Sequence, residues 1–226
     1  MIGVFDSGVG GYTALSEIRR LSKSTDIIYL SDSKNAPYGT KTEEELVTLV
    51  SRDIDILHSA GAKKILIACC TASTVYPLLD EKRRNLSVPI ILPAAKCAAR
   101  LTGNGRIGVI ATERTVLSRA FSSALSEYEV FETPAQRLVS LIESGERDGR
   151  ISENTEQYLK SLLLPLGEKG IDTLILGCTH FPHLEKEINK ILPEIKTVSP
   201  SREGAKQLLS VYKPGGKGKI SYLWAD

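Results

Sequence analysis

The sequence predicts an α/β protein with two pseudo-symmetric lobes, each a mostly parallel sheet flanked by helices, and an active site in the cleft between them. Short apolar runs alternate along the chain with longer segments of helical periodicity, which is typical of parallel sheets with helical connections. Most of these runs are rich in Ile, Val and Leu without polar alternation, as strands buried on both faces are. Two strand motifs also recur further along the chain.

The apolar runs give the expected strands in order. They cover residues 2–5, 27–30, 64–68, 88–92, 106–110, 128–131, 173–176, 196–198 and 219–223. Helix signatures lie between them. Thr42 with Glu45 three residues later forms a capping box ahead of an apolar helical stripe. Pro182 occupies a first-turn position ahead of Leu184 and Ile188, so we expect a helix to begin there.

The recurring motifs indicate an internal duplication. Ile-Gly-Val at 2–4 recurs at 107–109, a likeness that any two buried strands could share. The apolar strand at 65–71, which ends in Cys69, Cys70 and Thr71, is echoed more specifically at 174–179, which ends in Cys178 and Thr179. We therefore predict one lobe from residues 1–93 plus 200–226, carrying Asp6 and Cys69, and a second from 94–199, carrying Cys178 and His180.

Length and composition restrict the class of protein. A chain of 226 residues can bury a core without disulfides. Its 29 Lys and Arg against 27 Asp and Glu give no bulk charge that would attract nucleic acid or an acidic membrane surface. The N-terminus lacks a signal-peptide pattern, and the apolar run at 65–70 is far below the roughly 18 residues of a membrane span. We expect a cytoplasmic enzyme without nucleic-acid or membrane partners.

The four cysteines are too sparse for a secreted disulfide scaffold, and a bridge between the adjacent Cys69 and Cys70 would be strained. Cys69 and Cys178 each end an apolar strand, and the carboxyl ends of strands form the ligand crevice in open α/β sheets. Two facing lobes would therefore place one of these cysteines on each side of a shared cleft. Cys97 is expected to be a packing residue.

Two thiols on opposite sides of a cleft suit inversion of a carbon stereocentre, which needs a base on one face and an acid on the other. A free thiol titrates near pH ~8.5, so each needs a neighbouring group to tune it. His180 follows Cys178 by two residues, and Asp6 can approach Cys69 from an adjacent strand end. A Cys-His hydrolase nucleophile is an alternative that leaves Cys69 without a role.

Two loops complete the expected cleft. Residues 6–11, Asp-Ser-Gly-Val-Gly-Gly, follow the first strand and permit close backbone approach to an anion. Residues 37–39, Pro-Tyr-Gly, follow the second strand and form a candidate cleft wall in which Gly39 exposes a backbone N–H. No dinucleotide or phosphate-loop motif and no C-x-x-C pair occurs, so we expect neither a cofactor nor a metal.

Four segments in order resemble the signature segments of bacterial glutamate racemases, members of the cofactor-independent aspartate/glutamate racemase superfamily. They are residues 6–11, 37–39, 68–73 and 177–180, and the agreement extends from Ile2 to about Gly204. The resemblance implies an amino-acid racemase, an isomerase whose partner is a small-molecule amino-acid substrate. Its product, D-glutamate, would supply peptidoglycan synthesis.

The resemblance also implies the roles of individual residues. Cys69 and Cys178 would exchange the proton, with Cys178 acting on the L-isomer and Cys69 on the D-isomer. Asp6 would assist Cys69, and His180 would assist Cys178. The residues implied to hold the substrate are Asp6, Ser7, Tyr38, Gly39, Cys70, Thr71, Thr179 and His180.

Two departures from the family keep alternatives open. Cys70 stands where the family has Asn, and losing that amide would cost about 1–3 kcal/mol if it anchors substrate. The chain also ends soon after its final expected strand, so we expect that the family's terminal helical segment is missing. The alternatives are a racemase for another acidic amino acid such as aspartate, a weakened binding or regulatory relative, and a thiol redox protein based on Cys69 and Cys70. A homodimer is compatible with these features.

Overall fold

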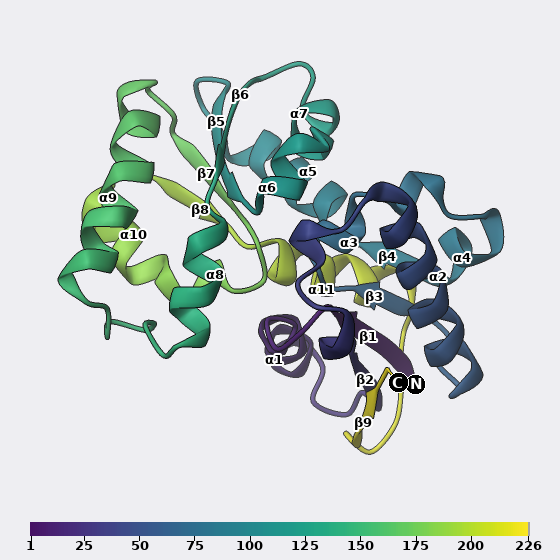
Figure 1. Cartoon of the computed structure of the whole chain (residues 1–226). Helices are drawn as coiled ribbons and strands as arrows, with labels where there is room; N and C mark the ends of the chain where they lie inside the picture. The colour runs from purple at the N-terminus through teal and green to yellow at the C-terminus, as the bar shows by residue number, and fades with distance from the viewer. Residues whose placement is uncertain (226) are drawn as a thin grey trace.

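The computed structural model describes residues 1–225 as two β-sheets, each flanked by helices (Figure 1). The first sheet has the strand order β4-β3-β1-β2-β9, and the second has the order β6-β5-β7-β8. All strand pairs within the two sheets are parallel. The predicted α/β fold with two lobes is confirmed.

The strands are short and mostly buried. Those of the first sheet are β1 (Ile2–Asp6), β2 (Ile27–Ser31), β3 (Ile65–Ile67), β4 (Ser87–Pro89) and β9 (Ile220–Trp224). Those of the second are β5 (Arg106–Ala111), β6 (Glu129–Pro134), β7 (Thr173–Gly177) and β8 (Lys196–Val198). Each expected strand has a counterpart here; β8 has the expected bounds, and the bounds of the others differ by one to three residues.

Helices connect the strands. They are α1 (Tyr12–Leu21), α2 (Glu43–Ser59), α3 (Cys70–Ser73), α4 (Glu81–Leu86), α5 (Ile91–Leu101), α6 (Glu113–Leu117), α7 (Ala120–Ala124), α8 (Gln136–Glu143), α9 (Glu153–Glu168), α10 (Glu185–Ile191) and α11 (Pro200–Val211). Four 3-10 turns are η1 (Ser33–Asn35), η2 (Tyr38–Thr40), η3 (Tyr76–Leu78) and η4 (Phe181–Leu184). The predicted capping box of α2 forms, because Thr42 Oγ1 accepts from the Glu45 N–H while the Glu45 carboxylate accepts from the Thr42 N–H.

Two sequence expectations were wrong in detail. The strand expected at 88–92 ends at Pro89, and a helix begins at Ile91. This helix, α5, packs against β7, α7 and α11, and a largely apolar helix of this kind cannot be told from a buried strand by periodicity. Pro182 begins no α-helix; it lies in the 3-10 turn η4, and α10 starts at Glu185.

A continuous apolar core joins the two lobes. One buried cluster contains residues from both sheets together with α1, α5 and α11, and two further clusters lie beneath α2 and beneath α8–α10. The chain passes between the sheets through α5 and returns through α11 (Figure 1). Because these helices pack against each other, the carboxyl ends of β1 and β3 are held facing those of β5 and β7.

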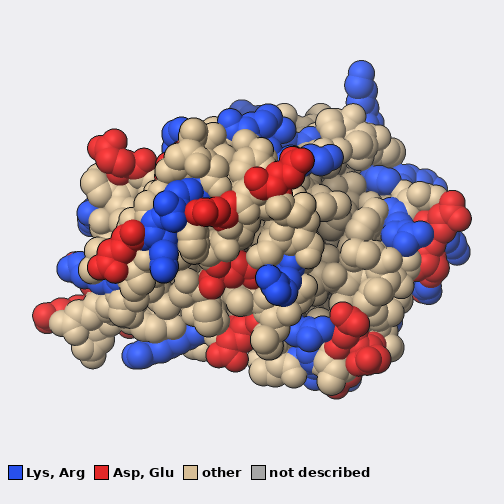
Figure 2. Space-filling model, turned by 90° about the horizontal axis from the view of Figure 1, so that it is seen from above, with Lys and Arg blue, Asp and Glu red and all other residues tan. Residues whose placement is uncertain are grey.

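The outer surface carries mixed charge. Acidic and basic side chains are interspersed on the face shown in Figure 2, in line with the net charge of +2. Among residues 1–225, none of the helices combines the length and apolar character needed to span a membrane.

Candidate active site

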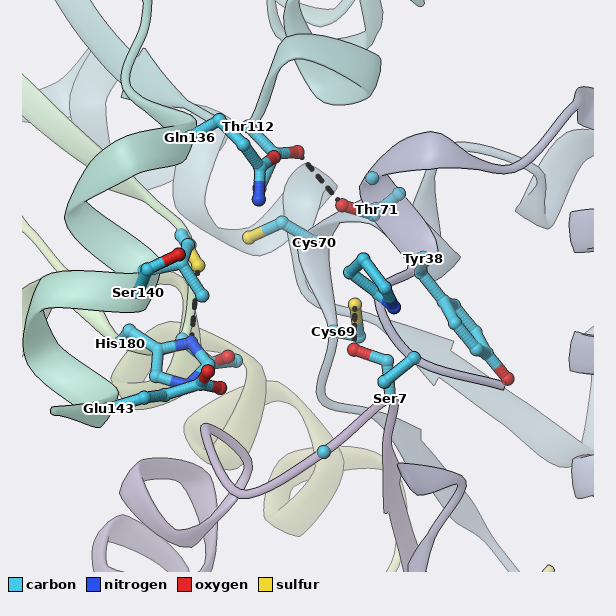
Figure 3. Close-up of a pocket in the computed structure, with 17 residues that line it drawn as sticks. Ser7, Tyr38, Cys69, Cys70, Thr71, Thr112, Gln136, Ser140, Glu143 and His180 are labelled. Atoms are coloured by element: carbon cyan, nitrogen blue, oxygen red, sulfur yellow. Dashed lines mark hydrogen bonds and ion pairs between the residues drawn. The ribbon is translucent and has the colours of Figure 1, made fainter. Parts of the chain in front are cut away.

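A cavity of about 290 Å³ lies between the two lobes at the carboxyl ends of the strands (Figure 3). This is the position at which open parallel sheets bind ligands, because the loops after the strands converge there. The residues that line it are Ser7, Gly8, Ala36, Pro37, Tyr38, Gly39, Cys69, Cys70, Thr71, Thr112, Gln136, Val139, Ser140, Glu143, Cys178, Thr179 and His180. The cavity therefore contains nearly all the residues expected from the sequence.

The two strand-end thiols, Cys69 and Cys178, face this cavity from opposite lobes and are buried. Burial raises the pKa of the Cys69 thiol to about 11, and the neighbouring charge of Asp6 adds to that rise. Burial likewise raises the pKa of Cys178, and a negative charge on Cys69 raises it further. Both shifts favour the neutral thiols, and the site disfavours two thiolates at once.

The surroundings of Cys69 are polar. Its Sγ lies 3.5 Å from Ser7 Oγ and accepts from the backbone N–H of Ala72 at 3.5 Å. Asp6 makes no hydrogen bond with the thiol; its carboxylate accepts from the Gly8 N–H at 2.9 Å and from Thr179 Oγ1 at 3.4 Å. Burial raises the pKa of Asp6, and the nearby His180 acts in the opposite direction. Asp6 thus affects Cys69 through charge rather than by contact.

His180 forms the immediate environment of Cys178. The Nδ1 atom of its ring lies 3.5 Å from the Cys178 Sγ, and its Nε2 atom lies 3.1 Å from a carboxylate oxygen of Glu143. The second contact has the distance of an ion pair but not the alignment of a hydrogen bond. The ring is therefore placed to take a proton from the thiol, with a carboxylate nearby to stabilise the resulting positive charge.

Two expected binding residues point their hydroxyl groups elsewhere. The Thr71 Oγ1 lies 2.9 Å from Thr112 Oγ1, in a buried hydroxyl cluster that joins the lobes. The Tyr38 hydroxyl lies 2.5 Å from an Asp32 oxygen and 2.9 Å from an Asp53 oxygen, away from the thiols (Figure 3). Tyr38 therefore contributes other atoms to the cavity wall, and its phenol anchors the segment that carries Gly39.

Cys70 also lies in the cavity wall, with its sulfur directed into the space (Figure 3). Within residues 1–225, no hydrogen bond to its side chain is formed, and the residue is also part of the apolar core. Burial raises the pKa of this thiol well above its ordinary value. At neutral pH, Cys70 is thus a neutral group with weak hydrogen-bonding capacity.

One wall of the cavity was missed from the sequence. Helix α8 contributes Gln136, Val139, Ser140 and Glu143, which share one helical face through their spacing of three and four residues. Thr112, at the end of β5, also lines the cavity. The available signal was the carboxyl end of the strand expected at 128–131, because α8 begins directly after β6, together with polar side chains at helical spacing.

The cavity wall contains no lysine and no arginine. Any carboxylate bound there must therefore be held by neutral N–H and O–H donors, together with the imidazole of His180. Across residues 1–225, no group of three or more His, Cys, Asp or Glu side chains is arranged to hold a metal ion.

Comparisons with known proteins give one consistent result. The family model described as Asp/Glu/Hydantoin racemase matches residues 9–208. A glutamate racemase of Desulforudis audaxviator is 43% identical over 206 residues, which cover 88% of this chain and 74% of that protein. The crystal structure of glutamate racemase from Francisella tularensis in complex with D-glutamate has a TM-score of 0.88 at 30% identity, covering 100% of this chain and 88% of that chain. A Bacillus anthracis glutamate racemase has a TM-score of 0.87 at 32% identity, covering 99% and 87%.

Proposed function

The chain belongs to the Asp/Glu/hydantoin racemase family, and we propose on that premise that it interconverts L- and D-glutamate without a cofactor. The resemblance to glutamate racemases recognised from four sequence motifs is confirmed by these relatives. The observation that carries the proposal is the pair of buried thiols, Cys69 and Cys178, which face one cavity from opposite lobes.

The proposed reaction is a proton exchange at the substrate Cα. The thiolate on one face removes the Cα proton, and the thiol on the opposite face delivers its own proton to the resulting carbanion. The first sulfur then holds a proton and the second is a thiolate, so the reverse reaction uses the same groups with exchanged roles. Cys178 is proposed to act on L-glutamate and Cys69 on D-glutamate.

Neighbouring groups are proposed to tune each thiol. His180, 3.5 Å from Cys178, would take the thiol proton, and Glu143 would stabilise the imidazolium. On the other side, Ser7 can donate a hydrogen bond to Cys69 and so favour its thiolate, while Asp6 sets the local charge. These roles are supported by the geometry of each thiol and its polar neighbours.

The substrate's charged groups are proposed to bind neutral donors. Ser7 and the backbone at Gly39 and Thr179 supply O–H and N–H groups around the cavity, and a fixed array of such donors also stabilises the charge that develops next to Cα. The glutamate racemase of Francisella tularensis binds D-glutamate, which supports the same ligand here. We further propose that the product, D-glutamate, serves peptidoglycan synthesis.

The experiment is racemisation in D2O. Incubation of the protein with L-glutamate should yield D-glutamate that carries deuterium at Cα, and the double variant Cys69→Ser/Cys178→Ser should yield none. Cys97→Ser is the matched control, because Cys97 lies outside the cavity and should leave the rate unchanged. Absence of exchange with the wild-type protein would disprove the function, and a clear preference for aspartate in a substrate panel would favour the alternative suggested by Cys70.

A cytoplasmic location and a homodimer remain predictions. The dimer is tested by size-exclusion chromatography with light scattering, in which a monomer has a mass of 24.6 kDa and a dimer twice that mass. The location is tested by fractionating cells and assaying racemisation in each fraction.

A further inference from the structure

Gln136 reaches from α8 in the second lobe to the Gly39 segment of the first. A Cβ atom built on Gly39 would lie only 2.7 Å from the Gln136 Oε1, closer than real contacts allow. Because Gly39 has no side chain, the carboxamide of Gln136 can lie directly against the opposite lobe. No other residue type at position 39 would permit this approach without movement of the glutamine.

The carboxamide of Gln136 has no partner in the part of the chain that the structure describes. Its Oε1 is shielded from solvent and unpaired, and its Nε2 makes no hydrogen bond with residues 1–225. A carboxamide offers two donors and two acceptor positions, and a buried unsatisfied polar group is costly. Figure 3 shows the amide nitrogen directed into the cavity, on the side of Cys70. A ligand carboxylate in the cavity would supply an acceptor for the Nε2 donor.

The needs of the substrate point to the same group. Glutamate carries two carboxylates, and the cavity wall offers no lysine or arginine to neutralise them. The hydroxyls of Tyr38 and Thr71 are already occupied by Asp32, Asp53 and other threonines. Gln136 carries the only carboxamide among the lining residues, so it is the free side-chain N–H donor on its side of the cavity.

We propose that Gln136 is a substrate-binding residue whose Nε2 donates a hydrogen bond to a carboxylate of the bound amino acid. This inference rests on the proposed function, because it takes a dicarboxylic amino acid as the ligand. The substrate then contacts α8 of one lobe and the loops of the other at once. Cys70, which faces the same space, offers only a weak donor and cannot replace the amide.

The test uses two variants in which the side chain at position 136 keeps nearly the same length. Gln136→Met removes both polar atoms, and Gln136→Glu replaces the donor by a carboxylate that repels the substrate. Loss of a hydrogen bond to a charged group should raise KM for glutamate about tenfold or more. The thiols are untouched, so kcat should stay within about threefold of the wild-type value. Gln157→Met is the matched control, because Gln157 is exposed on α9 and does not line the cavity.

The outcomes separate this inference from the proposed function. If the wild-type protein does not racemise glutamate, the proposed function fails. If it does, and KM for Gln136→Met and Gln136→Glu stays within about twofold of wild type, only the role of Gln136 fails. Thermal unfolding of each variant identifies a folding defect, and the Glu variant decides the question if the Met variant is unstable. A KM for Gln136→Met that is about tenfold or more above wild type, at similar kcat, supports the proposed hydrogen bond.

Discussion

A carboxylate oxygen of Glu143 lies 3.1 Å from the Nε2 atom of His180, on the side of the ring opposite Cys178. Glu143 is the last residue of α8, so the helix that forms one wall of the cavity also places a negative charge beside the imidazole. A charge at that distance would stabilise the imidazolium that we propose forms when His180 accepts the thiol proton.

Glu143→Gln should therefore slow racemisation. We expect kcat/KM to fall about tenfold, which corresponds to the loss of roughly one charge interaction near the ring. The decrease must be equal for L- and D-glutamate, because the two enantiomers have the same free energy. Steady-state assays in both directions measure it. A value within about twofold of wild type would show that Glu143 does not support His180.

Each single thiol variant should retain one half of the reaction. Cys178→Ser should lose racemisation by a factor of about 10²–10⁴. The remaining Cys69 can still remove and return the Cα proton of D-glutamate, so deuterium should enter that isomer without inversion. Cys69→Ser should show the converse exchange with L-glutamate. Proton NMR in D2O follows both exchange reactions. If each variant instead exchanges the opposite enantiomer, the assignment of the two cysteines is reversed.

The protein should lose stability in alkaline solution, in part through Cys70. Burial raises the pKa of this thiol well above its ordinary value in the folded state. In the unfolded chain the same thiol loses its proton at a lower pH than in the folded protein. The contribution of Cys70 to the free energy of unfolding is therefore fully present below pH ~8.5 and is lost as pH rises towards the folded pKa. Between pH ~9 and ~10, the free energy of unfolding should fall more steeply with pH in the wild-type protein than in Cys70→Ala. The two slopes should differ by about 1.4 kcal/mol per pH unit. Urea unfolding of both proteins measures the two slopes, and equal slopes would contradict the prediction.

Gly10 should be sensitive to the smallest substitution. A Cβ atom at this position would overlap Thr179 Oγ1 and lie 2.7 Å from the His180 ring, which belongs to the other lobe. Gly10→Ala should therefore separate the lobes and lower both the melting temperature and kcat. Gly8→Ala is the control for stability, because nothing lies within 4 Å of the added atom. Equal melting temperatures for the two variants would show that the lobes have room to adjust.

Tyr38→Phe should destabilise the wall of the cavity. The hydroxyl donates to the buried carboxylates of Asp32 and Asp53, and burial raises the pKa of Asp53 to about 6. Removing the donor should lower the free energy of unfolding at pH 7 by about 1–3 kcal/mol. Below pH ~6 the loss should shrink, because Asp53 becomes protonated and no longer needs the hydroxyl proton. The Tyr76 hydroxyl donates to a single backbone carbonyl, so Tyr76→Phe should lower the free energy of unfolding by less.

The sequence was informative where burial determines the pattern. The strands Ile65–Ile67 and Thr173–Gly177 are completely buried, so their apolar runs were visible and placed Cys69 and Cys178 at the carboxyl ends of strands in the two facing sheets. The contribution of α8 was harder to predict, because β6, the strand that leads into it, is only partly buried. Whether Gln136 faces a cavity depends on how the lobes are oriented, and that orientation is set by packing of α5 and α11 rather than by any local pattern.

The sequence also did not indicate in which direction a side chain points. The motif at 37–39 correctly indicated a cleft wall, but Tyr38 turns its hydroxyl towards Asp32 and Asp53 instead of the cavity. Asp53 lies on α2, fifteen residues further along the chain, and no motif links it to the tyrosine. Such pairings arise only when tertiary structure brings the two elements together.

The pairing of β9 with β2 sets an order for folding during protein synthesis. Ile220 pairs with Ile27, so the edge of the first sheet is covered by a strand that is synthesised about 190 residues after β2 and after the other strands of residues 1–225. By then every strand of the second sheet has been synthesised. The β2 edge therefore stays uncovered while most of the chain emerges from the ribosome, and during that interval it can pair with a strand of another molecule. Correct folding depends on β9 reaching this edge first.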